Sequence, residues 1–394
     1  MLLANSWQPS SLEDWQAAGF GLYVHWPFCQ AKCPYCDFNS HVSREVDHPR
    51  WARAFEAELD RIAAETGPRP LTSIFFGGGT PSLMEEATVA AIIERATALW
   101  APANDIEITL EANPTSVERA KFTAFAHAGV NRISMGIQSL VDEDLRRLGR
   151  LHSAREALDA YTTARSVFDR VSFDLIYGRQ DQSEAAWENE LDEALALGPD
   201  HLSLYQLTVE PGTVFGARFE RGKLPGLPSE DRGAELYHIT QSLTDAAGLA
   251  AYETSNHAKA GAECRHNLIY WRYGDFAGVG PGAHGRLTLG GIKYATDCLR
   301  DPGQWLQAVG AAGSGEASRQ DVPPAEQGEE YLMMGLRLTE GVDLERAMGL
   351  GANIDTARLG RMIEGGWLER DGSNLRTTRL GRPLLNAVLG ELLA

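Results

Sequence analysis

Three cysteines lie within eight residues of one another, at Cys29, Cys33 and Cys36. Three thiolates on one short loop can each bind one iron of a [4Fe-4S] cubane, which leaves the fourth iron open to a small molecule. A zinc ion would need a fourth ligand, which His25 or His41 could supply, but the C-x3-C-x2-C spacing is unlike the paired knuckles of zinc sites. Chance grouping of structural cysteines is the other alternative. The spacing favours the iron–sulfur cluster.

A glycine-rich segment, residues 77–81, and three polar residues lie at the ends of predicted strands: Glu111, Gln138 and Asp174. In parallel α/β folds the carboxyl ends of the strands carry the chemistry. Glycine lets the backbone approach a ligand closely. A polar side chain in this place more often faces a ligand than the core, because burial without a partner is costly. Each one could also be a capping or salt-bridge residue.

The elements that must position these residues alternate between apolar runs and amphipathic stretches. Strands are predicted at 21–26, 73–76, 107–110, 132–136, 171–176 and 201–207. Helices are predicted between them, at 51–65, 86–99, 154–167 and 185–197. Strand and helix alternating at this spacing predict a parallel sheet with helical crossovers. Six such units favour an α/β fold of the partial (β/α)6 barrel type over a flat sheet.

The domain organisation follows from the change of pattern along the chain. We expect an N-terminal segment at 1–20, a barrel with its extension at 21–300, and a loop-rich linker at 301–325. Residues 326–394 are predicted to form a smaller helical, winged-helix-like domain. Few basic residues lie near its end, so we do not expect it to bind DNA.

Composition excludes several classes of protein. The chain has 36 basic and 54 acidic residues, a formal net charge of −18, which argues against a broad nucleic-acid surface. Only Cys264 and Cys298 remain outside the cysteine loop, and they are expected to be small buried residues rather than a second site. The first residues show no signal peptide and no stretch is long enough to span a membrane, so a cytoplasmic protein is expected.

The cysteine loop, in the form Cys33-Pro34-Tyr35-Cys36 after a short strand, resembles the signature loop of the radical S-adenosylmethionine (SAM) superfamily. In that superfamily the open iron chelates the amino and carboxylate groups of SAM, and reduction of the cluster produces a 5′-deoxyadenosyl radical. The resemblance is to the coproporphyrinogen III dehydrogenase-like branch, and it implies which residues contact SAM. The implied positions are Tyr23, Gly78, Gly79, Thr80, Glu111, Gln138, Arg150 and Asp174.

Within that branch, three features are similar to the haem chaperones. Position 38 is Phe, where the dehydrogenases carry a further Cys, and only 22 residues precede Tyr23. The segment 266–271 has the form H-N-x-x-Y-W, so the resemblance makes His266, Asn267, Tyr270 and Trp271 the haem-binding candidates. An imidazole can ligate haem iron and aromatic rings can cover a porphyrin face. The alternative reading is a capped loop with two core aromatics.

The resemblance therefore implies a haem chaperone that carries a [4Fe-4S] cluster and SAM, with haem as cargo. The expected partners are haem, acceptor haemoproteins of respiration and a flavodoxin-like electron donor. Homodimerisation and peripheral contact with membrane haemoproteins stay open, as does whether the protein is an enzyme. The alternative is an oxygen-independent coproporphyrinogen III dehydrogenase. Radical modification of tRNA is a weaker third reading, because the acidic chain lacks a basic RNA-binding module.

Overall fold

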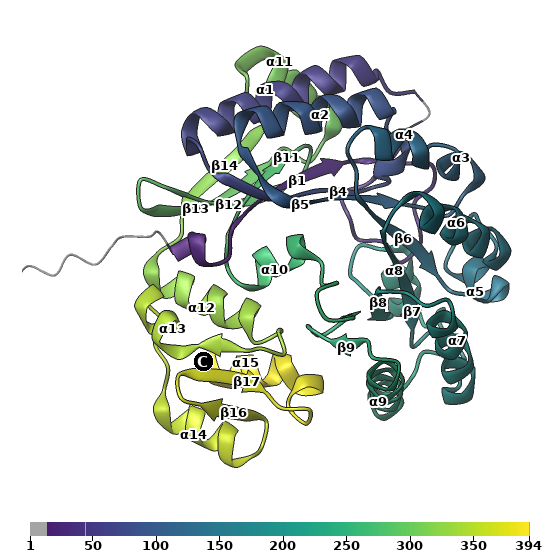
Figure 1. Cartoon of the computed structure of the whole chain (residues 1–394). Coiled ribbons are helices and arrows are strands. Elements are labelled where there is room, and N and C mark those ends of the chain that lie inside the picture. Colours follow the sequence, from purple (N-terminus) through teal and green to yellow (C-terminus); the bar gives the residue numbers. More distant parts are fainter. Residues whose placement is uncertain (1–13, 44, 394) are drawn as a thin grey trace, which may run out of the picture.

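Figure 1 shows the computed structural model of the chain, which describes residues 14–43 and 45–393. Its centre is a curved sheet of twelve strands, ordered β14-β13-β12-β11-β1-β4-β5-β6-β7-β8-β10-β9. Six of these strands run parallel and lie side by side in chain order. They are β1 (Phe20–Trp26), β4 (Pro70–Gly78), β5 (Ala101–Ala112), β6 (Arg132–Gln138), β7 (Arg170–Tyr177) and β8 (His201–Gln206). The partial (β/α)6 barrel expected from the sequence is confirmed.

Helices cover the convex face of this sheet (Figure 1). Strands covered on both faces read as continuous apolar runs, and Leu22, Val24, Ile74 and Phe76 are fully buried. The helices are α1 (His48–Thr66), α2 (Glu86–Leu99), α3 (Ser116–Arg119), α4 (Phe122–His127), α5 (Asp142–Arg147), α6 (Ala154–Val167), α7 (Glu184–Ala196), α8 (Val214–Glu220) and α9 (Glu230–Ala246).

Local sequence sets where these helices begin. Helix α6 starts with a capping box in which Ser153 caps the backbone of Glu156 and the Glu156 carboxylate accepts from the backbone of Ser153. Asp47 caps α1 and Ser183 caps α7 in the simpler way, with one side-chain acceptor. These caps satisfy amide groups that would otherwise lack partners at a helix start.

The sheet extends beyond the barrel at both edges. Strand β11 (Asp275–Val279) runs parallel to β1, and β12 (His284–Leu289), β13 (Ile292–Cys298) and β14 (Glu316–Asp321) follow it in antiparallel order. At the other edge β10 (Asn256–Ala258) and β9 (Ala250–Ala251) add two short antiparallel strands. Helix α10 (Arg265–Trp271) lies on the concave side of the sheet, where it contacts β1, β4 and β11 (Figure 1).

Residues 301–325 differ from the loop-rich linker expected from the sequence. They form helix α11 (Pro302–Ala312), which packs on α1, and strand β14, which is an edge of the main sheet. Trp305 of α11 is fully buried and stacks on Trp51 of α1 with ring centroids 5.4 Å apart. The backbone amide of Gly315 donates to the Glu58 carboxylate over 2.9 Å. These contacts join the segment to the barrel.

The C-terminal domain has the winged-helix-like form that was expected. Its three-stranded sheet has the order β15-β17-β16, and helices on it enclose a separate core that includes Leu332, Leu344 and Leu375. The elements are α12 (Pro324–Gly335), β15 (Val342–Asp343), α13 (Leu344–Leu350), α14 (Thr356–Glu364), β16 (Leu368–Asp371), β17 (Asn374–Thr377) and α15 (Leu385–Leu393). Figure 1 shows this domain in yellow, on the side of the molecule where α10 lies.

Buried polar contacts attach the C-terminal domain to the barrel extension. Glu330 of α12 accepts a hydrogen bond from the Tyr273 hydroxyl at 2.7 Å and an ion pair from Arg286 at 2.8 Å. Most of the predicted N-terminal segment, residues 1–13, lies outside the described residues. Among the residues that are described, no helix is long and apolar enough to cross a membrane.

Candidate functional site

The cysteine loop lies between two short strands, β2 (Phe28–Cys29) and β3 (His41–Val42), which pair with each other. All three loop cysteines are free thiols; Cys29 is buried and the other two are half-buried. Burial, together with the nearness of the other thiols, raises the pKa of Cys29 and Cys36, and the Thr80 hydroxyl on Cys29 opposes this. Thiols whose pKa is raised in this way, such as Cys29 and Cys36, need a cation nearby to be stable as thiolates.

The geometry does not suit a single metal ion. Among the described residues, no three His, Cys, Asp or Glu side chains converge closely enough to hold one ion. His25 is hydrogen-bonded through Nε2 to the Asn39 carbonyl at 2.9 Å, and His41 bonds to the Asn39 side chain. In a cubane each thiolate binds a different iron, so the sulfurs need not converge on one point. The donor set of three thiols fits a cluster better than zinc.

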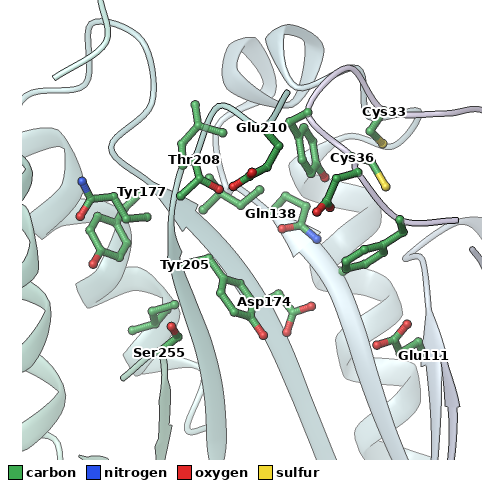
Figure 2. Close-up of a pocket in the computed structure, with 18 of the residues that line it drawn as sticks. Cys33, Cys36, Glu111, Gln138, Asp174, Tyr177, Tyr205, Thr208, Glu210 and Ser255 are labelled. Carbon is green, nitrogen blue, oxygen red and sulfur yellow. The ribbon is translucent and has the colours of Figure 1, made fainter. Parts of the chain in front are cut away.

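A cavity of about 900 Å³ opens beside the cysteine loop. Figure 2 shows the sulfurs of Cys33 and Cys36 at its side and the carboxylates of Glu111 and Asp174 within it. The structure brings ten of the predicted cluster and SAM residues to this one cavity: Cys29, Cys33, Cys36, Gly78, Gly79, Thr80, Glu111, Gln138, Arg150 and Asp174.

Tyr23 does not line this cavity. It lines a second one of about 170 Å³ deeper in the barrel, which shares Glu111 and Asp174 with the first. Its hydroxyl bonds to His25 at 3.1 Å, and its ring stacks near His266. Tyr23 therefore lies outside the large cavity, in the smaller cavity on the other side of Glu111 and Asp174.

Glycines at the end of β4 allow the cysteine loop to lie close to the sheet. A Cβ on Gly79 would come within 2.7 Å of the carbonyl oxygen of Phe28. Gly78 has φ of 108°, a left-handed value that favours glycine. The next residue, Thr80, donates its backbone amide to Phe28 over 2.9 Å and its hydroxyl to the Cys29 sulfur over 3.4 Å. This segment holds the start of the cysteine loop as well as facing the cavity.

Two half-buried carboxyl groups that face the cavity have raised pKa values. Burial, and then the charge of Asp174, raise the pKa of Glu111 to about 8. Burial raises the pKa of Asp174 to about 6, although Ser203 and the guanidinium groups of Arg132 and Arg150 oppose the shift. Neighbouring carboxyls with separated pKa values are typical of functional sites, because one stays neutral while the other ionises.

Arg150 joins the cysteine loop to the barrel. It donates to the Cys33 sulfur over 3.4 Å and to the carbonyl of Gly136 over 2.6 Å. Nearby, Gln138 adopts φ of 75°, which is unusual for a residue with a side chain. Strain of this kind at a cavity wall is common where a side chain must be held in a defined place.

The H-N-x-x-Y-W segment forms α10 and does not reach the large cavity. His266 is only 1% exposed; its Nδ1 bonds to the Ser73 hydroxyl at 2.7 Å and its Nε2 to the Tyr270 hydroxyl at 2.6 Å. Burial lowers its pKa to about 3, so the ring is neutral. Asn267 and Tyr270 line the small cavity with His266, whereas Trp271 lies under the Arg337 guanidinium at 4.7 Å.

The large cavity also has residues that the sequence did not indicate. Tyr177, Tyr205 and Tyr237 line it together with Arg382 of the C-terminal domain. Tyr205 sits at the end of the predicted strand 201–207, and that position was the signal available for it. Arg382 carries no such signal, because only the packing of two domains brings it to the barrel.

Comparison with known proteins gives two family matches. The profile of the Radical SAM superfamily matches residues 23–194, and that of the HemN C-terminal domain matches residues 322–384. Phe38 lies within the first of these matches. The H-N-x-x-Y-W segment, residues 266–271, lies in the part of the chain between the two matches.

Curated relatives are similar over nearly the whole chain. Radical S-adenosyl methionine domain-containing protein 1, mitochondrial, of Bos taurus is 40% identical, over 95% of this chain and 87% of its own. Heme chaperone HemW of Escherichia coli is 39% identical, over 95% of this chain and 98% of its own. The solved structure of coproporphyrinogen III oxidase (HemN) from Escherichia coli has a TM-score of 0.80 at 21% identity, covering 96% of this chain and 90% of that one. This last likeness concerns the fold alone.

Proposed function

The chain belongs to the radical SAM superfamily, in the family that includes heme chaperone HemW and radical S-adenosyl methionine domain-containing protein 1, and from this we propose that it is a haem chaperone. Membership of the superfamily implies a [4Fe-4S] cluster and SAM. The proposal adds haem as cargo and transfer of haem to acceptor haemoproteins. The full-length similarity to heme chaperone HemW is the observation that carries it.

In this proposal Cys29, Cys33 and Cys36 hold the cluster, which when bound supplies the electron and the open iron for SAM. A cluster with one open iron is consistent with three free thiols on the loop, each of which would bind a different iron. Arg150 and Thr80, which donate to two of the sulfurs, would lower the charge that a reduced cluster places on them.

The residues that would hold SAM surround the same cavity. Glu111 and Asp174 offer carboxylates for its cationic groups, and the ends of β4 and β6 offer Gly78, Gly79, Thr80 and Gln138. Arg150 offers a guanidinium for the carboxylate of SAM. We assign Tyr23 a positioning role, because it lies below Glu111 and bonds to His25.

The four haem-binding candidates of the sequence are proposed to act on haem only when α10 leaves the barrel. Both ring nitrogens of His266 are engaged, and an imidazole that binds iron must free one of them. A haem site that requires no such movement would have to use residues other than His266.

The second candidate function is oxidative decarboxylation of coproporphyrinogen III, favoured by the shared fold and by a cavity large enough for more than SAM. An anaerobic assay separates the two. The reconstituted protein is incubated with SAM, a reductant and coproporphyrinogen III, and haem binding is titrated in parallel. A haem chaperone binds haem and forms no protoporphyrinogen IX. Conversion of the porphyrinogen, or failure to bind haem, would refute the proposal.

A further inference from the structure

The large cavity is bigger than the SAM site predicted from the sequence. We call inner half the part of the cavity bounded by the strand ends and the cysteine loop. We call outer half the part bounded by residues that were not predicted to contact SAM, among them Gly233, Ala234, Tyr237, Arg382, Pro383 and Leu384. Helix α9 contributes Gly233, Ala234 and Tyr237 from one face, spaced as successive turns of a helix require. With 900 Å³, the cavity lies near the upper end of the roughly 300–1,000 Å³ range of ligand pockets. The outer half therefore has room for a second, larger ligand beside SAM.

A cation stands in this outer half without an anionic partner. Arg382 belongs to a single 3-10 turn, Arg382–Leu384, of the C-terminal domain. Within the described part of the chain it forms no salt bridge, and its Nε is buried without a hydrogen-bond partner. The guanidinium interacts with the Tyr237 hydroxyl, a neutral group. Arg382 as a whole is half-buried, but a guanidinium with a buried, unpartnered nitrogen and no anion is costly unless a ligand supplies the partner.

The same cavity has a second buried polar atom without a partner. The hydroxyl of Thr254 lines the cavity and, like Arg382 Nε, has no hydrogen-bond partner among the described residues. The acidic residues of the cavity wall away from the SAM carboxylates are Asp37, Glu210 and Glu230, and none of them forms an ion pair with Arg382 within the described part of the chain. The outer half thus offers hydrogen-bonding groups whose partners must come from outside the chain.

The mouth and wall of the outer half are apolar and aromatic. Phe38 is 57% exposed and Leu384 is 46% exposed, and both line the cavity with Pro383. Tyr205 is 43% exposed although it ends an inner strand, because its ring borders the cavity beside Asp174 (Figure 2). Exposed apolar side chains at a cavity mouth mark a surface that binds an apolar ligand. A flat ring system with carboxylate arms matches both the apolar mouth and the cation.

We propose that the outer half of the large cavity binds a propionate-bearing tetrapyrrole, with Arg382 of the C-terminal domain as the counter-ion of a propionate. This inference rests on the proposed haem-carrying function and gives it a site. Residues lining the cavity include no His or Met, and burial raises the pKa of its tyrosines Tyr177, Tyr205 and Tyr237, which disfavours the phenolate that would bind haem iron. The carboxylates and the ring carry the binding, and the ring is held loosely enough to be passed on.

The absence of these iron ligands gives the proposal a sharp test. The reconstituted, SAM-loaded protein is titrated with haem, with iron-free protoporphyrin IX and with the dimethyl ester of that porphyrin. Haem and the iron-free porphyrin are expected to bind with similar Kd. The dimethyl ester, which has no carboxylate, is expected to bind weakly. Arg382→Gln is expected to weaken the first two by about 10- to 100-fold, the scale of one charge-assisted hydrogen-bond pair.

Arg379→Gln is the matched control. Arg379 lies on the same segment, is 88% exposed, pairs with Asp245 and does not line the cavity, so this variant should bind all three ligands as the wild type does. SAM affinity and the thermal midpoint of Arg382→Gln are expected to be unchanged. Arg382→Lys, which keeps the charge, should restore part of the affinity.

The outcomes separate this inference from the proposed function. Wild-type protein that binds haem, with Arg382→Gln binding equally well, would overturn the site and leave the haem chaperone standing. Binding of haem without any binding of the iron-free porphyrin would overturn it too, and would direct attention to His266. Wild-type protein that binds neither ligand would overturn both. A loss of SAM affinity in Arg382→Gln would assign the guanidinium to SAM instead.

Discussion

At the scale of single residues, the cysteine loop places three thiols together and gives each a different surrounding. Cys29 is held by the Thr80 hydroxyl, Cys33 by the Arg150 guanidinium and Cys36 by the turn that returns its amide to the Cys33 carbonyl. Hydrogen bonds to cluster sulfurs tune the charge and potential of iron–sulfur centres. The loop is thus built for a cluster whose potential is set by its neighbours.

Changing Cys33 to Ala is expected to abolish the broad iron–sulfur absorbance and SAM cleavage, because two thiolates cannot retain three irons of a cubane. Absorbance and iron content after anaerobic reconstitution provide the measurement. Cys298→Ala is the control: this buried cysteine lies away from the loop, with its sulfur 3.8 Å from the Gly278 carbonyl. A full four-iron cluster in Cys33→Ala would refute the ligand assignment.

Glu111 should make stability depend on pH in an unusual direction. Its pKa is raised from 4.5 to about 8 in the folded protein, so the folded state binds the proton more tightly than the unfolded chain does. The free energy of unfolding should therefore fall as the pH rises from about 5 to about 8. Asp174, raised from 3.8 to about 6, adds an effect of the same sign at lower pH.

Glu111→Gln should remove most of this pH dependence. At pH 8 the variant is expected to be more stable than the wild type by about 1–4 kcal/mol, and at pH 5 nearly equal, because the amide is neutral at both values. Chemical denaturation of SAM-free protein at the two pH values measures it. Glu230→Gln, an exposed residue of the same cavity, should leave the curves unchanged. Parallel wild-type and Glu111→Gln curves would contradict the raised pKa.

At the scale of elements, α10 forms the floor of the barrel. Its His266 fills the space between Ser73 of β4 and Tyr270, with Phe75 stacked on the ring at a centroid distance of 5.1 Å. Gly21 of β1 has no room for a side chain beside it, since a Cβ there would come within 3.2 Å of His266 Nδ1. The helix therefore closes the small cavity beneath Glu111 and Asp174.

His266→Ala is expected to lower the free energy of unfolding by about 2–4 kcal/mol, because it leaves a cavity and removes the hydrogen-bond partner of the Ser73 and Tyr270 hydroxyls. Asn267→Ala, on the same helix and half-buried, should cost less than about 1 kcal/mol. Urea denaturation compares the two variants. A His266→Ala protein of wild-type stability that has lost haem binding would show the residue to be an iron ligand and not part of the floor.

The strands and helices of the barrel were predictable because their signals are local. A short, largely apolar run such as 73–76, followed by glycines, predicts a strand without any knowledge of its neighbours in space. The segment 301–325 was not predictable, because Trp305 becomes a core residue only through Trp51, which is distant in the sequence. Its short, Gly-rich stretches read as a loop until that partner is known.

In the site too, residues marked by local sequence could be predicted, and residues placed by distant contacts could not. The cysteines, Glu111, Gln138 and Asp174 could be predicted to lie together because each was placed near the carboxyl end of a strand, and parallel strands bring those ends together; all six line the large cavity. The orientation of His266 was not predictable, since the motif itself does not say whether α10 faces the barrel or the solvent. Arg382 was not predictable either, because it reaches the cavity only through the docking of one domain on another.

At the scale of the whole molecule, that docking depends on Glu330. Its carboxylate accepts from the Tyr273 hydroxyl and from Arg286, two residues of the barrel extension. Burial alone would raise the pKa of Glu330, but Arg286 and Tyr273 hold it below its ordinary value of 4.5. The stabilisation is therefore present above that value and is lost as the pH falls through the folded pKa.

Glu330→Ala should loosen the C-terminal domain and, with it, Arg382. We expect the free energy of unfolding to fall by about 2–3 kcal/mol, because the variant leaves Arg286 and Tyr273 without their acceptor. Protoporphyrin binding should weaken several-fold while the iron–sulfur absorbance stays unchanged, since the cysteines lie on the loop that begins in β2, whereas Glu330 lies on α12 of the C-terminal domain. Glu329→Ala, at the exposed neighbouring position, should change neither the free energy of unfolding nor protoporphyrin binding. If Glu330→Ala were destabilised yet bound the porphyrin as tightly as the wild type, the cavity would not depend on how the two domains meet, and the tetrapyrrole site would belong to the barrel alone.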